Sequence, residues 1–186
     1  MSADGAGDVM SGKSRERLRP LEARDLEVIR TWRNHPDIRR YMYTQHTIGR
    51  EEHQRWFEHA DADPDKYLLI FERDGVPTGF VNLSIVDQAA RRAEWGFYLA
   101  PEAPKGSGTL LGKRALSYAF KDLNQNKLCG EALAANHRSI RFHERLGFRQ
   151  EGRLRDHHFD GSEYHDVIAF GLMAREWHEE TGPGTR

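Results

Sequence analysis

The sequence contains a single cysteine, Cys129, so the chain can form no internal disulfide and has no cysteine pair for a metal site. It contains no apolar run near the roughly 20 residues that a membrane-spanning helix needs, and no apolar stretch typical of a signal peptide. Its formal net charge is −1 at pH 7, which gives no bulk attraction to nucleic acid or to a membrane surface. These deficits predict a soluble cytoplasmic protein without a nucleic-acid or membrane partner.

What the chain does contain is enough apolar material for one folded domain. Hydrophobic residues make up 38% of its 186 residues, and nine Phe and four Trp supply large side chains for a core. The segment 1–14 is rich in Gly, Ser, Ala and Asp, and we expect a disordered leader there. We expect a single domain over residues 15–179 and a loose tail over residues 180–186.

Periodicity and turn residues predict an interleaved order of helices and strands. Pro36 disfavours the α conformation at His35, so the first helix is expected to end near Asn34. Thr47 has the position of an N-cap for the next helix, and Asp74-Gly75 is typical of a hairpin turn. The expected strands cover residues 15–21, 67–72, 76–86, 91–100, 127–133, 148–157 and 164–174, and the expected helices cover residues 24–34, 49–60, 109–123 and 136–146.

The loop Lys105-Gly106-Ser107-Gly108 lies between a predicted strand and a predicted long helix that begins at Thr109. Glycines let backbone N–H groups turn inward, and a helix N-terminus adds partial positive charge. Such a loop suits an anion, and a pyrophosphate in particular. A simple glycine-rich turn is the alternative interpretation of these residues taken alone.

Glu131 interrupts an otherwise apolar predicted strand over residues 127–133. A carboxyl group buried in such a strand would have a raised pKa and would suit a general base that takes a proton from an ammonium group. A salt bridge to a nearby Arg is the alternative. Glu94, which shares one face of the strand over residues 91–100 with Gly96 and Tyr98, is the second candidate base.

The segment over residues 134–148, A-A-N-H-R-S-I-R-F-H-E-R-L-G-F, passes from the end of a strand into a short helix that stops at Gly147. Asn136, Ser139 and His143 share one helix face, at the kind of strand-to-helix junction where α/β sheets place ligands. His143 is a candidate proton donor, because an imidazolium can lose its proton near neutral pH. A half-buried histidine hydrogen-bonded to a neighbour is the alternative.

Arginines and aromatic residues gather in the first third of the chain. Arg33, Arg39, Tyr43 and His53 lie in or near W-R-N, R-R-Y-M-Y and E-E-H. Arg suits phosphate groups, and aromatic side chains suit a ring. Taken one at a time, the same residues are a helix end, a solvated loop and a core histidine.

The pattern N-x-x-S-x-x-x-H-x-x-x-G-F over residues 136–148, together with the loop before Thr109, resembles the GNAT acyl-CoA N-acetyltransferases. That family usually has Tyr where this chain has His143, and Gln or Arg where it has Ala103. The resemblance implies an α/β (α+β) fold, with about four helices around a mixed, mostly antiparallel sheet splayed between strands 91–100 and 127–133. It implies acetyl-CoA as co-substrate and leaves a homodimer open.

The resemblance also implies roles for single residues. Glu131 would help to deprotonate the amine, His143 would protonate the CoA thiolate, and Tyr98 is the other side chain that could supply that proton. The loop would hold the pyrophosphate, and Asn136 would position CoA or a water. The expected acetyl-CoA residues are Phe97, Tyr98, Leu99, Lys105, Gly106, Ser107, Gly108, Thr109, Asn136 and Ser139.

Within the family, W-R-N-H-P-D-I-R-R-Y-M-Y-T at residues 32–44, E-E-H at 51–53 and A-E-W-G-F-Y at 93–98 resemble the N-acetyltransferases of the pseudaminic acid pathway. This resemblance implies acetylation of the 4-amino group of a UDP-linked amino-dideoxy sugar, so an amino sugar nucleotide is the expected partner. The expected substrate residues are Arg33, Arg39, Tyr43 and His53 on the nucleotide side and Asn82 and Ser84 near the sugar.

Two other functions fit many of the same residues. A protein N-terminal or ribosomal-protein acetyltransferase would keep the acetyl-CoA residues and need an open peptide groove. An acyl-CoA-binding sensor would keep the loop and lack a working base. A metal site is not expected, because the histidines are scattered and His157-His158 lacks a third ligand at a recognisable spacing.

Overall fold

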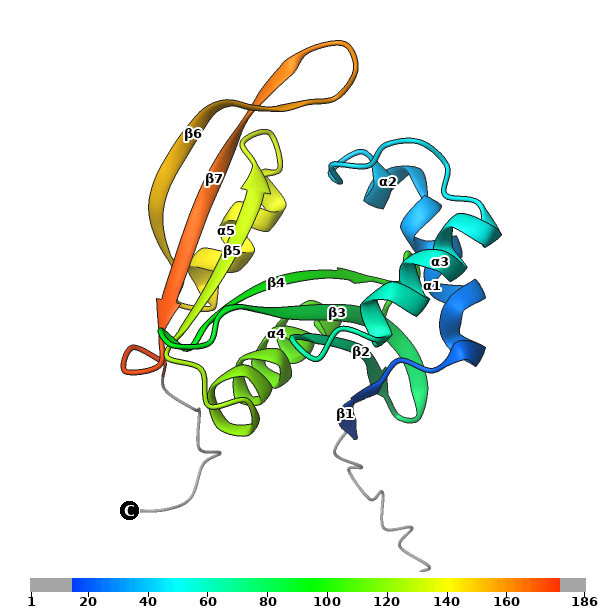
Figure 1. Cartoon of the computed structure of the whole chain (residues 1–186), viewed down its shortest axis with the longest axis horizontal. Helices are drawn as coiled ribbons and strands as arrows, with labels where there is room; N and C mark the ends of the chain where they lie inside the picture. The colour runs from blue at the N-terminus through cyan, green and yellow to red at the C-terminus, as the bar shows by residue number, and fades with distance from the viewer. Residues whose placement is uncertain (1–14, 178–186) are drawn as a thin grey trace, which may run out of the picture.

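The computed structural model describes residues 15–177, which form one seven-stranded sheet with helices on both faces (Figure 1). The strand order is β1-β2-β3-β4-β5-β7-β6, and every neighbouring pair is antiparallel except β4 and β5. The predicted mixed, mostly antiparallel sheet is therefore confirmed. The expected leader and the tail at 180–186 lie outside the described residues. The strands are β1 (Glu16–Pro20), β2 (Lys66–Arg73), β3 (Val76–Asp87), β4 (Arg92–Leu99), β5 (Lys127–Leu133), β6 (Arg149–Phe159) and β7 (Tyr164–Met173).

The α-helices of the described residues are α1 (Leu26–Asn34), α2 (Pro36–Arg39), α3 (Arg50–Asp61), α4 (Ser107–Ser117) and α5 (His137–Arg145). The predicted end of the first helix is confirmed, because His35 is extended before Pro36. The predicted N-cap at Thr47 is wrong: Gly49 caps α3, while the Thr47 hydroxyl accepts a hydrogen bond from Arg39. None of the helices within residues 15–177 is long and apolar enough to cross a membrane.

The pleat of the central strands separates two apolar cores. Val81 and Leu83 of β3 are fully buried in a core that also contains residues of α4 and α5. Phe80, on the other face of β3, packs in a second core with Ile29 and Trp32 of α1 and with residues of α3. The helices α1 and α3 thus cover one face of the sheet and α4 and α5 the other, as Figure 1 shows.

The sheet opens between β4 and β5. These strands pair over only three positions, from Arg92 opposite Lys127 to Glu94 opposite Cys129, although β4 continues to Leu99 and β5 to Leu133. Beyond that point the two ribbons diverge (Figure 1). The opening, here called the wedge, leaves one backbone edge of β4 without a strand partner, because β3 pairs only with its other edge. Free N–H and C=O groups in the middle of a sheet suit an extended ligand.

Candidate active site

Two carboxylates lie beside the wedge on the sheet face that carries α1 and α3. Glu94 is exposed on β4, while its neighbours Ala93 and Trp95 are buried in the core on the opposite face. Glu131 is exposed on β5 and approaches the same region, because Tyr43 from the segment between α2 and α3 contacts it. The strand alternation predicted for β4 is therefore confirmed, and both candidate bases face one side.

The predicted burial of Glu131 is wrong. Gly130 and Ala132 face the core and leave the Glu131 side chain on the open face of β5. The hydroxyl of Tyr43 donates a hydrogen bond of 2.6 Å to Oε2 of Glu131. Partial burial and this hydrogen bond raise the pKa of Tyr43 above its ordinary range, so the phenol keeps its proton. Among residues 15–177 Glu131 forms no ion pair, so the alternative salt bridge does not form there either.

His143 is buried beneath the wedge, with 1% of its surface exposed. Its Nδ1 lies 2.9 Å from the backbone oxygen of Ser139, and its Nε2 lies 3.2 Å from the indole nitrogen of Trp95. The carbonyl can only accept and the indole can only donate, so the imidazole is neutral with its proton on Nδ1. Burial lowers the pKa of His143.

This environment favours the packing alternative for His143, and its role as proton donor to the thiolate stays a prediction. The ring stacks on Phe170 at 4.7 Å and packs edge-on against Phe148 at 5.1 Å, so no solvent stabilises a charge there. Gly130 makes the packing possible, because a Cβ atom at that position would lie 2.6 Å from the Trp95 indole nitrogen and 2.7 Å from His143 Nε2. The packing interpretation of His143 is the one that the structure supports.

Asn136 and Ser139 begin α5 at the end of β5. The Asn136 side chain accepts a hydrogen bond of 3.1 Å from the backbone N–H of Ser139, so it caps the helix. The contact occupies only Oδ1 of Asn136, so a role of this side chain in positioning CoA or a water stays a prediction. The Ser139 hydroxyl is half-buried and lies 3.5 Å from Nδ1 of His143. Of the three side chains expected to converge, Asn136 therefore caps the helix and His143 packs in the core.

The loop Lys105-Gly106-Ser107-Gly108 forms the N-terminus of α4. Gly106 has φ +89°, a left-handed conformation that favours glycine, and the helix begins directly after it. Ser107 is fully buried and its hydroxyl accepts a hydrogen bond from Arg73, so this residue can contribute to the predicted anion site only through its backbone. The amides of Gly108 and Thr109 have no partner within the helix because they lie in its first turn. A Cβ atom at Gly108 would lie 3.5 Å from Leu99, which places this turn beside the end of β4.

A cavity of about 240 Å³ lies between α1, α3 and the sheet. Its polar residues include Arg33, whose Nη1 is buried without a hydrogen-bond partner among residues 15–177. Arg33 Nη2 donates to the backbone oxygen of Thr44 over 2.9 Å, and burial lowers the pKa of the guanidinium. Trp56 stacks on the buried His53 at 5.0 Å. The lining residues are Arg33, Thr44, Ile48, Glu52, His53, Trp56, Phe80 and Tyr98.

The cavity brings together Arg33, His53 and Tyr98, which the sequence placed in two different groups. Burial lowers the pKa of His53, so the ring is neutral near pH 7. The Tyr98 hydroxyl lies 3.4 Å from the backbone oxygen of Ile29, on the α1 side of β4. A role of Tyr98 as proton donor stays a prediction, and burial holds the pKa of its phenol above the ordinary value.

The remaining predicted substrate residues differ in their surroundings. Arg39 is half-buried at the end of α2 and donates to the Thr47 hydroxyl over 2.6 Å, outside the residues that line the cavity. Asn82 lies opposite Gly96 in the β3–β4 ladder, and its Oδ1 is buried without a partner within the described chain. Ser84 lies opposite Glu94 in the same ladder.

Sequence reasoning missed three side chains of this region. Trp56 lines the cavity, although the sequence analysis gives it no site role. Trp95 bonds His143 in the core. His158 is considered from the sequence only as a metal ligand, and its ring stacks on Tyr43 at 4.6 Å. No local pattern in the sequence indicates any of these three contacts.

One cluster of acidic and histidine side chains lies at the β6–β7 turn, and it consists of Asp160, Glu163 and His165. Asp160 Oδ1 accepts hydrogen bonds from the backbone and hydroxyl of Ser162, and Asp160 Oδ2 lies 2.7 Å from His165 Nε2. These contacts lower the pKa of Asp160 and raise that of His165. These hydrogen bonds within the β6–β7 turn explain why the three side chains lie together.

Comparisons with known proteins agree with this architecture. The family model described as Acetyltransferase (GNAT) domain matches residues 15–149. The ribosomal N-acetyltransferase homologue YdaF of Bacillus subtilis is 35% identical over 124 residues. These cover 66% of this chain and 67% of YdaF. Acetyltransferase PseH of Campylobacter jejuni is 31% identical over 131 residues, which cover 69% of this chain and 79% of PseH.

A solved structure extends the likeness to most of the described chain. The spermidine N-acetyltransferase of Vibrio cholerae, crystallised with CoA and spermine, superimposes with a TM-score of 0.81 at 27% sequence identity. The superposition covers 87% of this chain and 96% of that protein.

Proposed function

Because the chain belongs to the GNAT acetyltransferase family, we propose that it transfers an acetyl group from acetyl-CoA to the 4-amino group of a UDP-linked amino-dideoxy sugar, as in pseudaminic acid biosynthesis. N-acetyltransfer is the chemistry of the family. The nature of the amine is inferred from the cavity beside α1 and α3.

The observation that carries the proposal is Arg33, which lines that cavity and whose buried Nη1 has no hydrogen-bond partner among residues 15–177. A buried N–H group without a partner costs free energy, and a phosphate oxygen would remove that cost with a charge-assisted hydrogen bond. Arg33 has no carboxylate partner within residues 15–177 that would have to be displaced. A polyamine would instead bring its own positive charge next to the guanidinium.

Aromatic rings on the other walls suit the rest of a nucleotide. Trp56 is 38% exposed and meets Phe80 edge-on at 6.0 Å, and Tyr98 packs against Phe80 at 5.2 Å. Exposed ring faces stack favourably on a planar base. The neutral His53 beneath Trp56 offers hydrogen bonding without a fixed charge.

The path from the cavity to the wedge follows β4. Gly96 lies two residues before Tyr98 on the same strand face, which corresponds to roughly 6.6 Å. No atom lies within 4 Å of a Cβ placed on Gly96, so a sugar ring has room there. Asn82 lies opposite with its unpartnered Oδ1, which can accept from a sugar hydroxyl. A nucleotide in the cavity therefore directs its sugar toward Glu131.

Acetyl-CoA is proposed to bind from the other face of the sheet. The unpaired edge of β4, at Phe97, Tyr98 and Leu99, offers backbone groups to the pantetheine amides. The first turn of α4 offers the amides of Gly108 and Thr109, and the helix dipole, to the pyrophosphate. Lys105 is exposed beside this turn and adds a positive charge.

Glu131 is the proposed base. Its carboxylate accepts a proton from the substrate ammonium, directly or through a water, and the free amine attacks the thioester carbonyl. A backbone N–H on the unpaired edge of β4 polarises that carbonyl. The C–N bond forms, the nitrogen loses its second proton to water, the C–S bond breaks, and the thiolate takes a proton from water, since the imidazole of His143 is neutral and buried.

A second candidate is a polyamine acceptor, and the two exposed carboxylates Glu94 and Glu131 favour it because both attract an ammonium group. Product analysis separates the candidates. The protein is incubated with acetyl-CoA and, separately, a UDP-linked 4-amino sugar, spermidine or a ribosomal-protein N-terminal peptide, and the products are identified by mass spectrometry. We expect acetylation of the sugar. Acetylation of spermidine or the peptide alone would refute the proposal, and thiol release without any acceptor product would do the same.

A further inference from the structure

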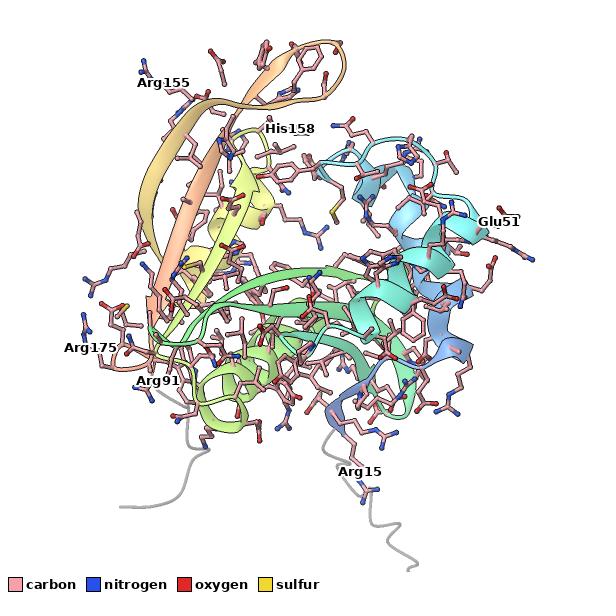
Figure 2. All side chains as sticks on the ribbon, viewed as in Figure 1. Arg15, Glu51, Arg91, Arg155, His158 and Arg175 are labelled. Carbon is pink, nitrogen blue, oxygen red and sulfur yellow. The ribbon has the colours of Figure 1, made fainter. Side chains whose placement is uncertain are left out.

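Tyr43 connects three elements that are distant in the sequence. It lies in the segment between α2 and α3, donates a hydrogen bond from its hydroxyl to Glu131 on β5, and stacks its ring on His158 of β6. The two ring centroids are 4.6 Å apart with an angle of 30° between the planes. Figure 2 shows His158 where the β6–β7 hairpin faces the segment after α2. Nothing in the acetyl-transfer scheme above uses His158.

A local irregularity of β6 precedes this histidine. The β6–β7 register shifts between Leu154 and His158, so that the bulged strand carries extra residues. Within the bulge Asp156 has φ +50°, which is unfavourable for a residue with a side chain. Asp166 of β7 accepts hydrogen bonds from the Asp156 backbone at 2.9 Å and from Arg153 at 2.6 Å. Bulges redirect side chains near functional sites, and this one immediately precedes His158.

The contacts of His158 do not show that this residue is placed there to stabilise the fold. Its Nε2 is buried and has no hydrogen-bond partner in the described part of the chain. A buried polar atom without a partner is unfavourable, and residues that keep one tend to serve a site. His158 lies opposite His165 across the ladder, with ring centroids 6.2 Å apart, so its second face is supported by β7.

We propose that His158 is a positioning residue of the acceptor site, which holds the Tyr43 ring so that the Tyr43 hydroxyl fixes one oxygen of Glu131. The other oxygen, Oε1, then stays available to the amine. The same contact holds the segment over residues 42–49 against β5 and β6 at Tyr43, which remains 49% exposed. This proposal rests on the proposed role of Glu131 as the base.

The first test needs no substrate. Backbone hydrogen exchange of residues 42–49 is compared in the parent, His158→Ala, His158→Phe and His157→Ala proteins. His157 is the matched control, because it is the exposed neighbour on the same strand. We expect faster exchange only in His158→Ala, since Phe retains a ring that stacks on Tyr43. Equal exchange in His158→Ala and the parent overturns the proposal, whichever amine the enzyme uses.

The second test is kinetic and uses the amine that product analysis identifies. We expect His158→Ala to lower kcat/KM for the amine by roughly 2- to 12-fold, the range of one aromatic pair, without changing KM for acetyl-CoA. His158→Phe should restore the rate. In a Tyr43→Ala background, His158→Ala should have no further effect, because the two residues act as one unit. An unchanged kcat/KM in His158→Ala, or no rescue by Phe, overturns the positioning role. If no amine of the panel is acetylated, the proposed function fails and the exchange experiment still decides the contact.

Discussion

The indole N–H of Trp95 donates a hydrogen bond to Nε2 of His143 over 3.2 Å, in the core beneath the wedge. This contact occupies the ring nitrogen that a proton donor to the thiolate would need, and the other nitrogen already donates to Ser139. We therefore infer that the position at which the GNAT family usually has Tyr serves packing in this chain, and we expect the thiolate to take its proton from water.

His143→Phe tests this assignment. Loss of a catalytic acid lowers turnover by roughly 10²–10⁴-fold, whereas we expect a change below about tenfold with acetyl-CoA affinity intact. The variant leaves the Trp95 N–H buried and unpaired, so we expect the free energy of unfolding to fall by about 1–3 kcal/mol. Steady-state kinetics and urea unfolding measure the two effects. A hundredfold lower kcat in a stably folded variant would restore the catalytic assignment.

The stability of the protein should depend on pH through His53 and His143. Burial lowers the pKa of both histidines in the folded state, so below about pH 6.5 the unfolded chain binds protons that the folded chain does not. We expect each to reduce the free energy of unfolding by up to about 1.4 kcal/mol per pH unit as the pH falls from 6.5 to 5. Urea unfolding at several pH values should show that the free energy of unfolding depends less steeply on pH in His143→Phe than in the parent. An identical slope in the variant would contradict the assigned neutral state.

Acetyl-CoA should raise the melting temperature of the parent, because a ligand that binds only the folded state stabilises it. Gly106→Val should abolish this shift, since a side chain at that position blocks the approach of the pyrophosphate to the α4 turn. Gly147→Val is the matched control: Gly147 has φ +91°, close to the +89° of Gly106, and lies at the end of α5. Both variants should lose stability, and only the control should keep the shift. A full shift in Gly106→Val would remove the pyrophosphate from this turn.

The sequence predicted the order and type of nearly all elements, because each depends on local signals such as Pro36, Asp74-Gly75 and the glycines before α4. It also predicted which side chains share a strand face. It did not predict which face of a strand is directed toward the core. In K-L-C-G-E-A-L of β5, the small residues Gly130 and Ala132 face the core, so Glu131 is exposed. Hydrophobicity alone favoured the opposite orientation.

The candidate site was only partly predictable for a different reason. Ser139 and His143 share a helix face as expected, but that face is directed into the aromatic core around Phe170. The contact between Tyr43 and Glu131 joins residues 88 positions apart. A pairing of this kind depends on how α2, β5 and β6 pack, and no periodicity or spacing in a single sequence specifies it.

The central claim, that the amine is linked to a nucleotide, is tested most directly by Arg33. The measurement is kcat/KM for a UDP-linked 4-amino sugar and for spermidine in the parent, in Arg33→Gln and in the control Arg24→Gln, whose side chain is exposed outside the cavity. We expect the parent to prefer the sugar by roughly 10²-fold or more. We expect Arg33→Gln to lower the value for the sugar by roughly 10- to 150-fold, the range of a charged hydrogen bond, and to leave spermidine and the control unchanged. A parent that acetylates spermidine as well as the sugar, or an Arg33→Gln variant that affects both amines equally, would contradict the claim.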